Sequence, residues 1–200
     1  MRINKGRAGG RAKILAFLLP AILGCGSTRD FAQKDVDWGY YTTIGVAPFQ
    51  SVATDRLAGS KVTSAFVNEL LMTRTFNVSE PGSFARAMTE VMKSQNSNDP
   101  TQLSASDLKL IGEKAQVQGI LLGTVREYDM VRVGQEEFPL VSIDLRLVDA
   151  PTGSLLWTAS LTKRGGPQLP FLSIGETHTL GQMTENVCRD LAGALAGRAR

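Results

Sequence analysis

The 200-residue chain has little histidine and cysteine: one histidine and two cysteines in all. A zinc site takes four ligands drawn mainly from these two residue types, so this composition argues against zinc chemistry. Two cysteines also exclude a disulfide-rich framework. The longest apolar run, residues 14–23, spans ten positions. A membrane-spanning helix needs roughly 20 residues, so the sequence predicts no transmembrane anchor.

Motifs of catalysis are also scarce. The sequence contains neither the G-x-S-x-G elbow of hydrolases nor the phosphate-binding loop G-x-x-x-x-G-K-[ST]. Ser106-Asp107-Leu108-Lys109 fits the S-x-x-K of penicillin-recognising enzymes, but a serine at a helix start explains it as well. We expect His178 to be solvated or to cap a helix, and Cys188 to pack as a small apolar side chain. The sequence predicts a non-catalytic protein without a metal or a dissociable cofactor.

The charge of the chain is unevenly distributed. The net charge of +3 comes from 22 Lys and Arg against 19 Asp and Glu. Five of these bases and none of the acids precede Cys25, so residues 25–200 carry 17 bases against 19 acids, a net charge of −2. No cluster of Lys and Arg with interleaved aromatic residues follows. We therefore expect no nucleic-acid partner.

The first 24 residues have the pattern of an export signal. Residues 1–13 carry all five early bases, residues 14–23 are apolar apart from one proline, and the small residue Gly24 follows. This arrangement is typical of a secretory signal peptide, here residues 1–24, with cleavage between Gly24 and Cys25.

The last residues of this segment, Ile22-Leu23-Gly24-Cys25, resemble the lipobox of bacterial lipoproteins. The resemblance implies a diacylglycerol on the sulfur of Cys25 and an acyl chain on its amino terminus. Several acyl chains anchor a protein stably, whereas one chain binds only marginally. Gly26 follows instead of Asp, which resembles lipoproteins held at the periplasmic face of the bacterial outer membrane. If Cys25 is lipidated, Cys188 has no intramolecular disulfide partner.

The remainder of the chain predicts one domain. We interpret residues 25–41 as the lipidated cysteine and a short tether, and residues 42–197 as a single periplasmic domain. Hydrophobic periodicity and turn signals predict strands at 42–49, 76–80, 119–132, 140–149 and 153–163, and helices at 60–73, from Pro81 onward, from the Ser104 capping box to about 115, and at 179–196.

The most strongly patterned pair of strands is 140–149 and 153–163, in which apolar and polar residues alternate. The turn Ala150-Pro151-Thr152-Gly153 between them predicts an antiparallel hairpin. The element order βαβααβββα indicates a mixed α+β fold. It would have one sheet of about five strands with a C-terminal antiparallel hairpin, packed by about four helices.

One long segment, residues 164–178, has no predicted helix or strand. It carries Leu169, Phe171, Leu172 and Ile174 among prolines and glycines. Such a segment is either packed down or functional. The two interpretations left open are that these side chains fold onto the sheet and that they bind a protein partner.

Several stretches together resemble one family: "TTIGVAPFQSVA", "KVTSAFVNELLMTRTFNVSE", "LIGEKAQVQGILLGTV" and "IDLRLVDAPTGSLLWTASL", after a lipobox. They are similar to the CsgG-type lipoproteins, which include the curli secretion channel and the LpoB-type activators of penicillin-binding proteins. The domain also resembles the amino-terminal domain of TolB. The resemblance covers roughly residues 40–197 and implies no catalytic or metal-binding residue.

This family resemblance sets the functional expectations. The first is a lipid-anchored periplasmic protein that binds an envelope protein partner during envelope assembly or secretion. The alternatives are a subunit of an oligomeric curli-type secretion channel, and an activator of a peptidoglycan synthase. A homo-oligomer is open in each case.

Overall fold

The computed structural model describes residues 28–94, 103–166 and 177–200. The strands are β1 (Arg29–Ala32), β2 (Thr43–Val46), β3 (Gln50–Ser51), β4 (Asn77–Val78), β5 (Gly119–Val133), β6 (Glu136–Asp149) and β7 (Leu155–Arg164). The helices are α1 (Ala58–Thr73), α2 (Pro81–Ser94), α3 (Ala105–Ala115) and α4 (Leu180–Arg198), and a short 3-10 helix, η1, covers Trp38–Tyr40.

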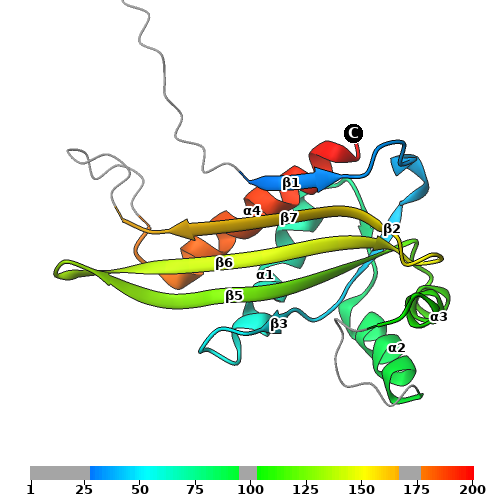
Figure 1. Cartoon of the computed structure of the whole chain (residues 1–200), viewed down its shortest axis with the longest axis horizontal. Coiled ribbons are helices and arrows are strands. Elements are labelled where there is room, and N and C mark those ends of the chain that lie inside the picture. The colour runs from blue at the N-terminus through cyan, green and yellow to red at the C-terminus, as the bar shows by residue number, and fades with distance from the viewer. Residues whose placement is uncertain (1–27, 95–102, 167–176) are drawn as a thin grey trace, which may run out of the picture.

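The strands form one seven-stranded sheet in the order β1-β7-β6-β5-β2-β4, with β3 paired to β5. Strands β2, β3 and β4 join by parallel pairing, whereas β5, β6, β7 and β1 are antiparallel to one another (Figure 1). The structure confirms the mixed α+β class. It corrects the expected number of strands from about five to seven, because β1 and β3 are too short to show a period-2 pattern.

Helices cover the two faces of the sheet unequally. Helices α1 and α4 pack on one face, where Phe66, Leu70, Val187 and Leu191 join the apolar residues of the central strands, and Trp157 is fully buried among them. Helices α2 and α3 cover the opposite face at one end only, as Figure 1 shows. The described helices therefore cover both faces of the sheet at that end and only one face over the rest of its length.

Local sequence signals explain where several elements begin and end. The capping box predicted at Ser104 is confirmed: its hydroxyl accepts from the Asp107 amide at 3.2 Å, and the Asp107 carboxylate accepts from the Ser104 amide at 3.0 Å. Pro81 is the first residue of α2, as expected for a residue without an amide hydrogen. The predicted hairpin of β6 and β7 is also confirmed, with Gly153 at φ +72° in its turn.

A second hairpin was not predicted from the sequence. Strands β5 and β6 pair from Gly119–Asp149 out to Val133–Glu136 and turn through Gly134-Gln135. Gly134 has φ +67°, whereas Gln135 has negative φ, as in a type II′ turn. Beyond Glu127, β5 pairs with β6 alone, so the outer part of this hairpin projects from the sheet (Figure 1).

The structure also revises the boundary of the domain. Residues 29–41 were predicted as part of a tether, but β1 pairs with β7 from Arg29–Ser160 to Ala32–Trp157, and η1 follows it. The folded domain therefore begins at or before residue 29. Among the described residues, no helix is both long enough and apolar enough to cross a membrane.

Candidate functional site

The part of the sheet that α2 and α3 leave uncovered among the described residues is a candidate binding surface (Figure 1). Two rows of side chains cross it from strand to strand. The first row is Arg29, Ser160, Asp144 and Thr124, and the second is Phe31, Thr158, Arg146 and Leu122. We call these residues, together with Arg126, the open sheet face. Leu122 is already buried under α2 and α3, so coverage by helices begins there.

The alternation of β6 and β7 produces this surface. In β6, Ile143 and Leu145 point into the core under α1 and α4, which directs Asp144 and Arg146 to the opposite face. In β7, Ala159 points into the same core, so Thr158 and Ser160 point outward. Because apolar and polar residues alternate along both strands, the apolar side chains face the helices, and the hydroxyls and charges of both signs gather on the opposite face.

Asp144 is at the centre of the polar contacts. Its carboxylate accepts a hydrogen bond from the Ser160 hydroxyl and pairs with the Arg126 guanidinium at 3.4 Å. Two shallow hollows adjoin it, with volumes of about 270 Å³ beside Thr124 and about 410 Å³ beside Phe31. The surface is therefore polar and hollowed around a paired charge.

Strand β1 is held in place from the helical side of the sheet. The Asp30 carboxylate accepts from the Trp157 indole at 3.2 Å and from Arg198 at 2.8 and 3.1 Å. The hydrogen bond from Arg198, and to a lesser degree that from Trp157, lowers the pKa of Asp30 against the opposing effect of burial. Because Asp30 points to the helices, its neighbours Arg29 and Phe31 point to the open sheet face.

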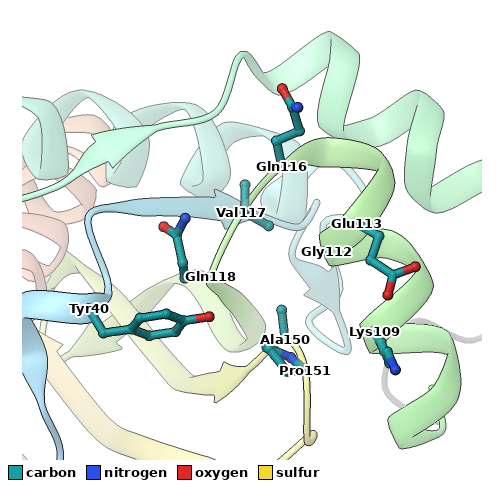
Figure 2. A pocket seen from close by; sticks show the side chains of 9 residues that line it. All are labelled: Tyr40, Lys109, Gly112, Glu113, Gln116, Val117, Gln118, Ala150 and Pro151. Atoms are coloured by element: carbon teal, nitrogen blue, oxygen red, sulfur yellow. The ribbon is translucent and has the colours of Figure 1, made fainter.

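A separate pocket of about 270 Å³ lies between η1, α3 and the turn that joins β6 to β7 (Figure 2). Tyr40 enters it from one side, Lys109 and Glu113 from α3 on the other, and Ala150 and Pro151 form its floor. Lys109, Glu113, Tyr40 and Gln116 supply a cation, a carboxylate, a phenol and an amide around it, and the side-chain carbonyl of Gln118 accepts from the Thr43 amide at 2.8 Å.

Some of the candidate residues named from the sequence lie outside the part of the chain that the structure describes, and the others lie within it. Gly24, Cys25 and the apolar residues Leu169, Phe171, Leu172 and Ile174 lie outside the described residues, so lipid attachment and protein binding at these positions stay predictions. Within residues 28–94, 103–166 and 177–200, no group of three or more His, Cys, Asp or Glu side chains is placed to hold a metal ion.

Ser106, His178 and Cys188, the residues considered for catalysis, each have different neighbours in the structure. Ser106 lies in the first turn of α3, where its hydroxyl is 2.8 Å from that of Ser104. The ring of His178 lies 6.2 Å from that of Phe138. Cys188 is fully buried under α1, and burial, with the nearby charges of Glu69 and Glu185, raises its pKa to about 12. A thiol in that state is a poor nucleophile.

Sequence reasoning did not identify the open sheet face. The polar positions of β6 and β7 were visible as an alternation, but their exposure depends on where α2 and α3 end. Strand β1 contributes Arg29 and Phe31, and its four residues carry no signal of their own. The one available sequence signal was the polar set Ser142, Asp144 and Arg146 facing away from the predicted core.

No family model and no curated protein sequence matches the chain. Among solved structures, the PelC dodecamer of Paraburkholderia phytofirmans is similar at 18% identity and a TM-score of 0.55, over 85% of this chain and 96% of PelC. Lipoprotein GNA1162 of Neisseria meningitidis is similar at 22% identity and a TM-score of 0.50, over 76% of this chain and 99% of GNA1162.

At these identities the likeness establishes a shared fold and nothing more. The C-terminal domain of LpoB from Salmonella enterica also matches, at 13% identity over 62% of this chain and 82% of that domain, but its TM-score of 0.44 is too low to argue from. The fold expected from the sequence, that of a bacterial lipoprotein domain, agrees with the match to GNA1162. These matches do not test the resemblance to CsgG.

Proposed function

We propose that this protein is a non-catalytic lipoprotein of the bacterial envelope whose domain binds another protein. In this proposal Cys25 carries the lipid and the outer membrane holds it, facing the periplasm. The observation that carries the binding role is the open sheet face, because a sheet surface that no described helix covers, with hollows and mixed charges, offers complementary groups to a protein partner. The shared fold with lipoprotein GNA1162 supports the setting.

The open sheet face is suited to a polar, specific contact. Its charges include Asp144, which is paired to Arg126 at 3.4 Å with both side chains partly exposed, so it can exchange partners at little cost. Threonine and serine hydroxyls both donate and accept hydrogen bonds. Phe31, 56% exposed at the margin of this face, adds an apolar contact of the kind enriched at interfaces.

A second candidate function is that of a subunit in a homo-oligomer. It is favoured by the likeness to PelC, which is a dodecamer and matches over 85% of this chain. In that case the partner at the open sheet face is another copy of the chain. Light scattering of the lipidated protein in detergent tests this: a mass of several subunits supports the proposal, and a clean monomer at high concentration removes it.

The role of peptidoglycan synthase activator is less favoured by the geometry. Only residues 26–28 separate Cys25 from β1, because the segment expected to be a tether forms part of the sheet. From Cys25 to Arg29 the chain reaches at most about 14 Å. An activator that acts across the peptidoglycan from the outer membrane needs a longer tether. A subunit of a curli-type channel is one form of the homo-oligomer that the second candidate function describes.

The test is recovery of a partner from membranes. Lipidated protein isolated in mild detergent should bring down a stoichiometric partner, and Thr124→Lys on the open sheet face should abolish the recovery by adding bulk and charge. The matched control is Asn68→Lys, which places the same side chain at an exposed position of α1. Repeated failure to recover a partner, or equal loss with both variants, contradicts the proposal.

A further inference from the structure

The distance between the predicted lipid and the folded domain is short enough to orient the domain. If Cys25 is lipidated, four residue steps lead from it to Arg29 in β1. Fully extended, they span at most about 14 Å, while the headgroup layer of one leaflet is about 5–8 Å thick. The 15 residues of β5 alone extend about 50 Å. A body of that size on so short a connection lies against the membrane.

The surface nearest the connection is the edge of the sheet formed by β1. Among the described residues, β1 pairs with β7 alone and is the terminal strand of the sheet. The amide of Gln33 donates inward to Leu156 at 2.9 Å, so by alternation the backbone groups of Asp30 and Ala32 point outward from the edge. These groups can exchange hydrogen bonds with lipid headgroups.

The side chains of β1 also fit a headgroup layer. Arg29 is exposed and makes no ion pair among the described residues, so its guanidinium is available to a lipid phosphate, which it binds in a bidentate manner. Phe31 is 56% exposed in the same strand, and aromatic rings are favoured at the membrane interface. The negative charge of Asp30 is neutralised by Arg198 at 2.8 Å, so it does not repel phosphates.

The charges that follow β1 favour a tilt of the β1 edge relative to the membrane surface. Lys34 is exposed and adds a cation, whereas Asp35 and Asp37 are exposed and acidic. The acids lie toward the far end of the edge from Arg29. The half of the edge that begins at Arg29 is therefore the half closest to the phosphates.

We propose that the β1 edge, residues 28–34, lies against the phospholipid headgroups of the membrane that holds the anchor. This inference rests on the proposed lipidation of Cys25. The sheet order β1-β7-β6-β5-β2-β4 then places β4 away from the membrane by five strand spacings, about 24 Å. The sheet stands upright, and the part of the open sheet face that β5, β6 and β7 carry is accessible from the side.

The test measures depth at two positions of the lipidated protein. Phe31→Cys and Asn77→Cys, in β1 and in the opposite edge strand β4, are each labelled with a fluorophore. Cys188 is fully buried and does not compete for the label. The proteins are reconstituted in vesicles of phosphatidylethanolamine and phosphatidylglycerol, with and without lipids that carry a quencher in the headgroup region. Lys34→Cys, on the same edge, serves as a second β1 position.

We expect quenching of most of the emission at position 31, weaker quenching at position 34 and none at 77. Equal quenching at 31 and 77, or stronger quenching at 77, overturns the orientation. Mass spectrometry of the same samples reports whether Cys25 is acylated. Absence of acylation refutes the lipid anchor and the orientation together, whereas acylation with quenching at 77 refutes the orientation alone.

Discussion

Asp30 is the most informative position for testing the architecture, because it decides whether the segment before residue 42 is folded or a tether. Its carboxylate joins three parts of the chain: β1, the Trp157 indole of β7 and Arg198 at the end of α4. Replacing Asp30 with Ala removes all these contacts. Replacing it with Asn keeps an acceptor for the indole but removes the charge.

The expected loss of unfolding free energy follows from the two groups that Asp30→Ala leaves without a partner, the Trp157 indole and the Arg198 guanidinium. Trp157 is fully buried, and a buried donor without an acceptor costs about 1–3 kcal/mol. The pair with Arg198 is half exposed on the arginine side, and such pairs add up to about 1 kcal/mol. We expect Asp30→Ala to lower the free energy of unfolding by about 2 kcal/mol. In a domain of this size each kilocalorie lowers Tm by about 2–4 °C. Asp30→Asn should cost about half as much, since it loses chiefly the charge.

Urea unfolding of residues 26–200 without lipid measures this loss, and its pH dependence has a defined sign. The pKa of Asp30 in the folded protein lies below the ordinary value of 3.8. A carboxylate with a lowered pKa stabilises the fold fully above the unfolded-state pKa and loses that contribution as the pH falls through the folded-state value. The gap between wild type and Asp30→Asn should therefore be full near neutral pH and close in acid below pH 3.8.

The control is Glu136→Ala, which removes an exposed carboxylate at the tip of the β5–β6 hairpin. It should leave the free energy of unfolding almost unchanged, because exposed substitutions away from such contacts have little effect. If Asp30→Ala is as stable as wild type, β1 is not part of the domain. The limit of about 14 Å between Cys25 and the folded domain then no longer holds either, because it assumes that the domain begins at Arg29.

Three further predictions concern single positions. Gly45→Ala should destabilise the domain by about 1–3 kcal/mol because its new methyl would overlap the Phe84 ring of α2; Gly193→Ala, in an open helical position, should be neutral or stabilising in the same thermal melts. In the folded protein Cys188 should not react with a thiol reagent, since it is buried with a pKa raised to about 12. It should react once the protein is unfolded. Fast reaction in the native state contradicts the packing of Cys188. Cys25→Ala should abolish palmitate labelling and leave an uncleaved precursor, and labelling that persists refutes the lipid anchor.

The elements that local signals define were predictable from the chain. The β6–β7 hairpin was predicted because its strands alternate and a Pro-Gly turn joins them, and the structure confirms it. The start of α3 was predicted from Ser104 and Asp107, two residues three positions apart. In both cases the deciding contacts lie within a few residues, so the pattern can be read without the fold. The export signal before Cys25 is local in the same sense and stays a prediction.

Tertiary structure alone decided where the domain begins and which sheet face is open. β1 is four residues long and mostly polar, and its stabilising contacts come from Trp157 and Arg198, which are 127 and 168 positions from Asp30. No pattern within the segment records such partners. The open sheet face likewise depends on how far α2 and α3 extend over the strands. Burial at one face of a strand is a property of what packs on it, and the strand's own sequence does not carry that information.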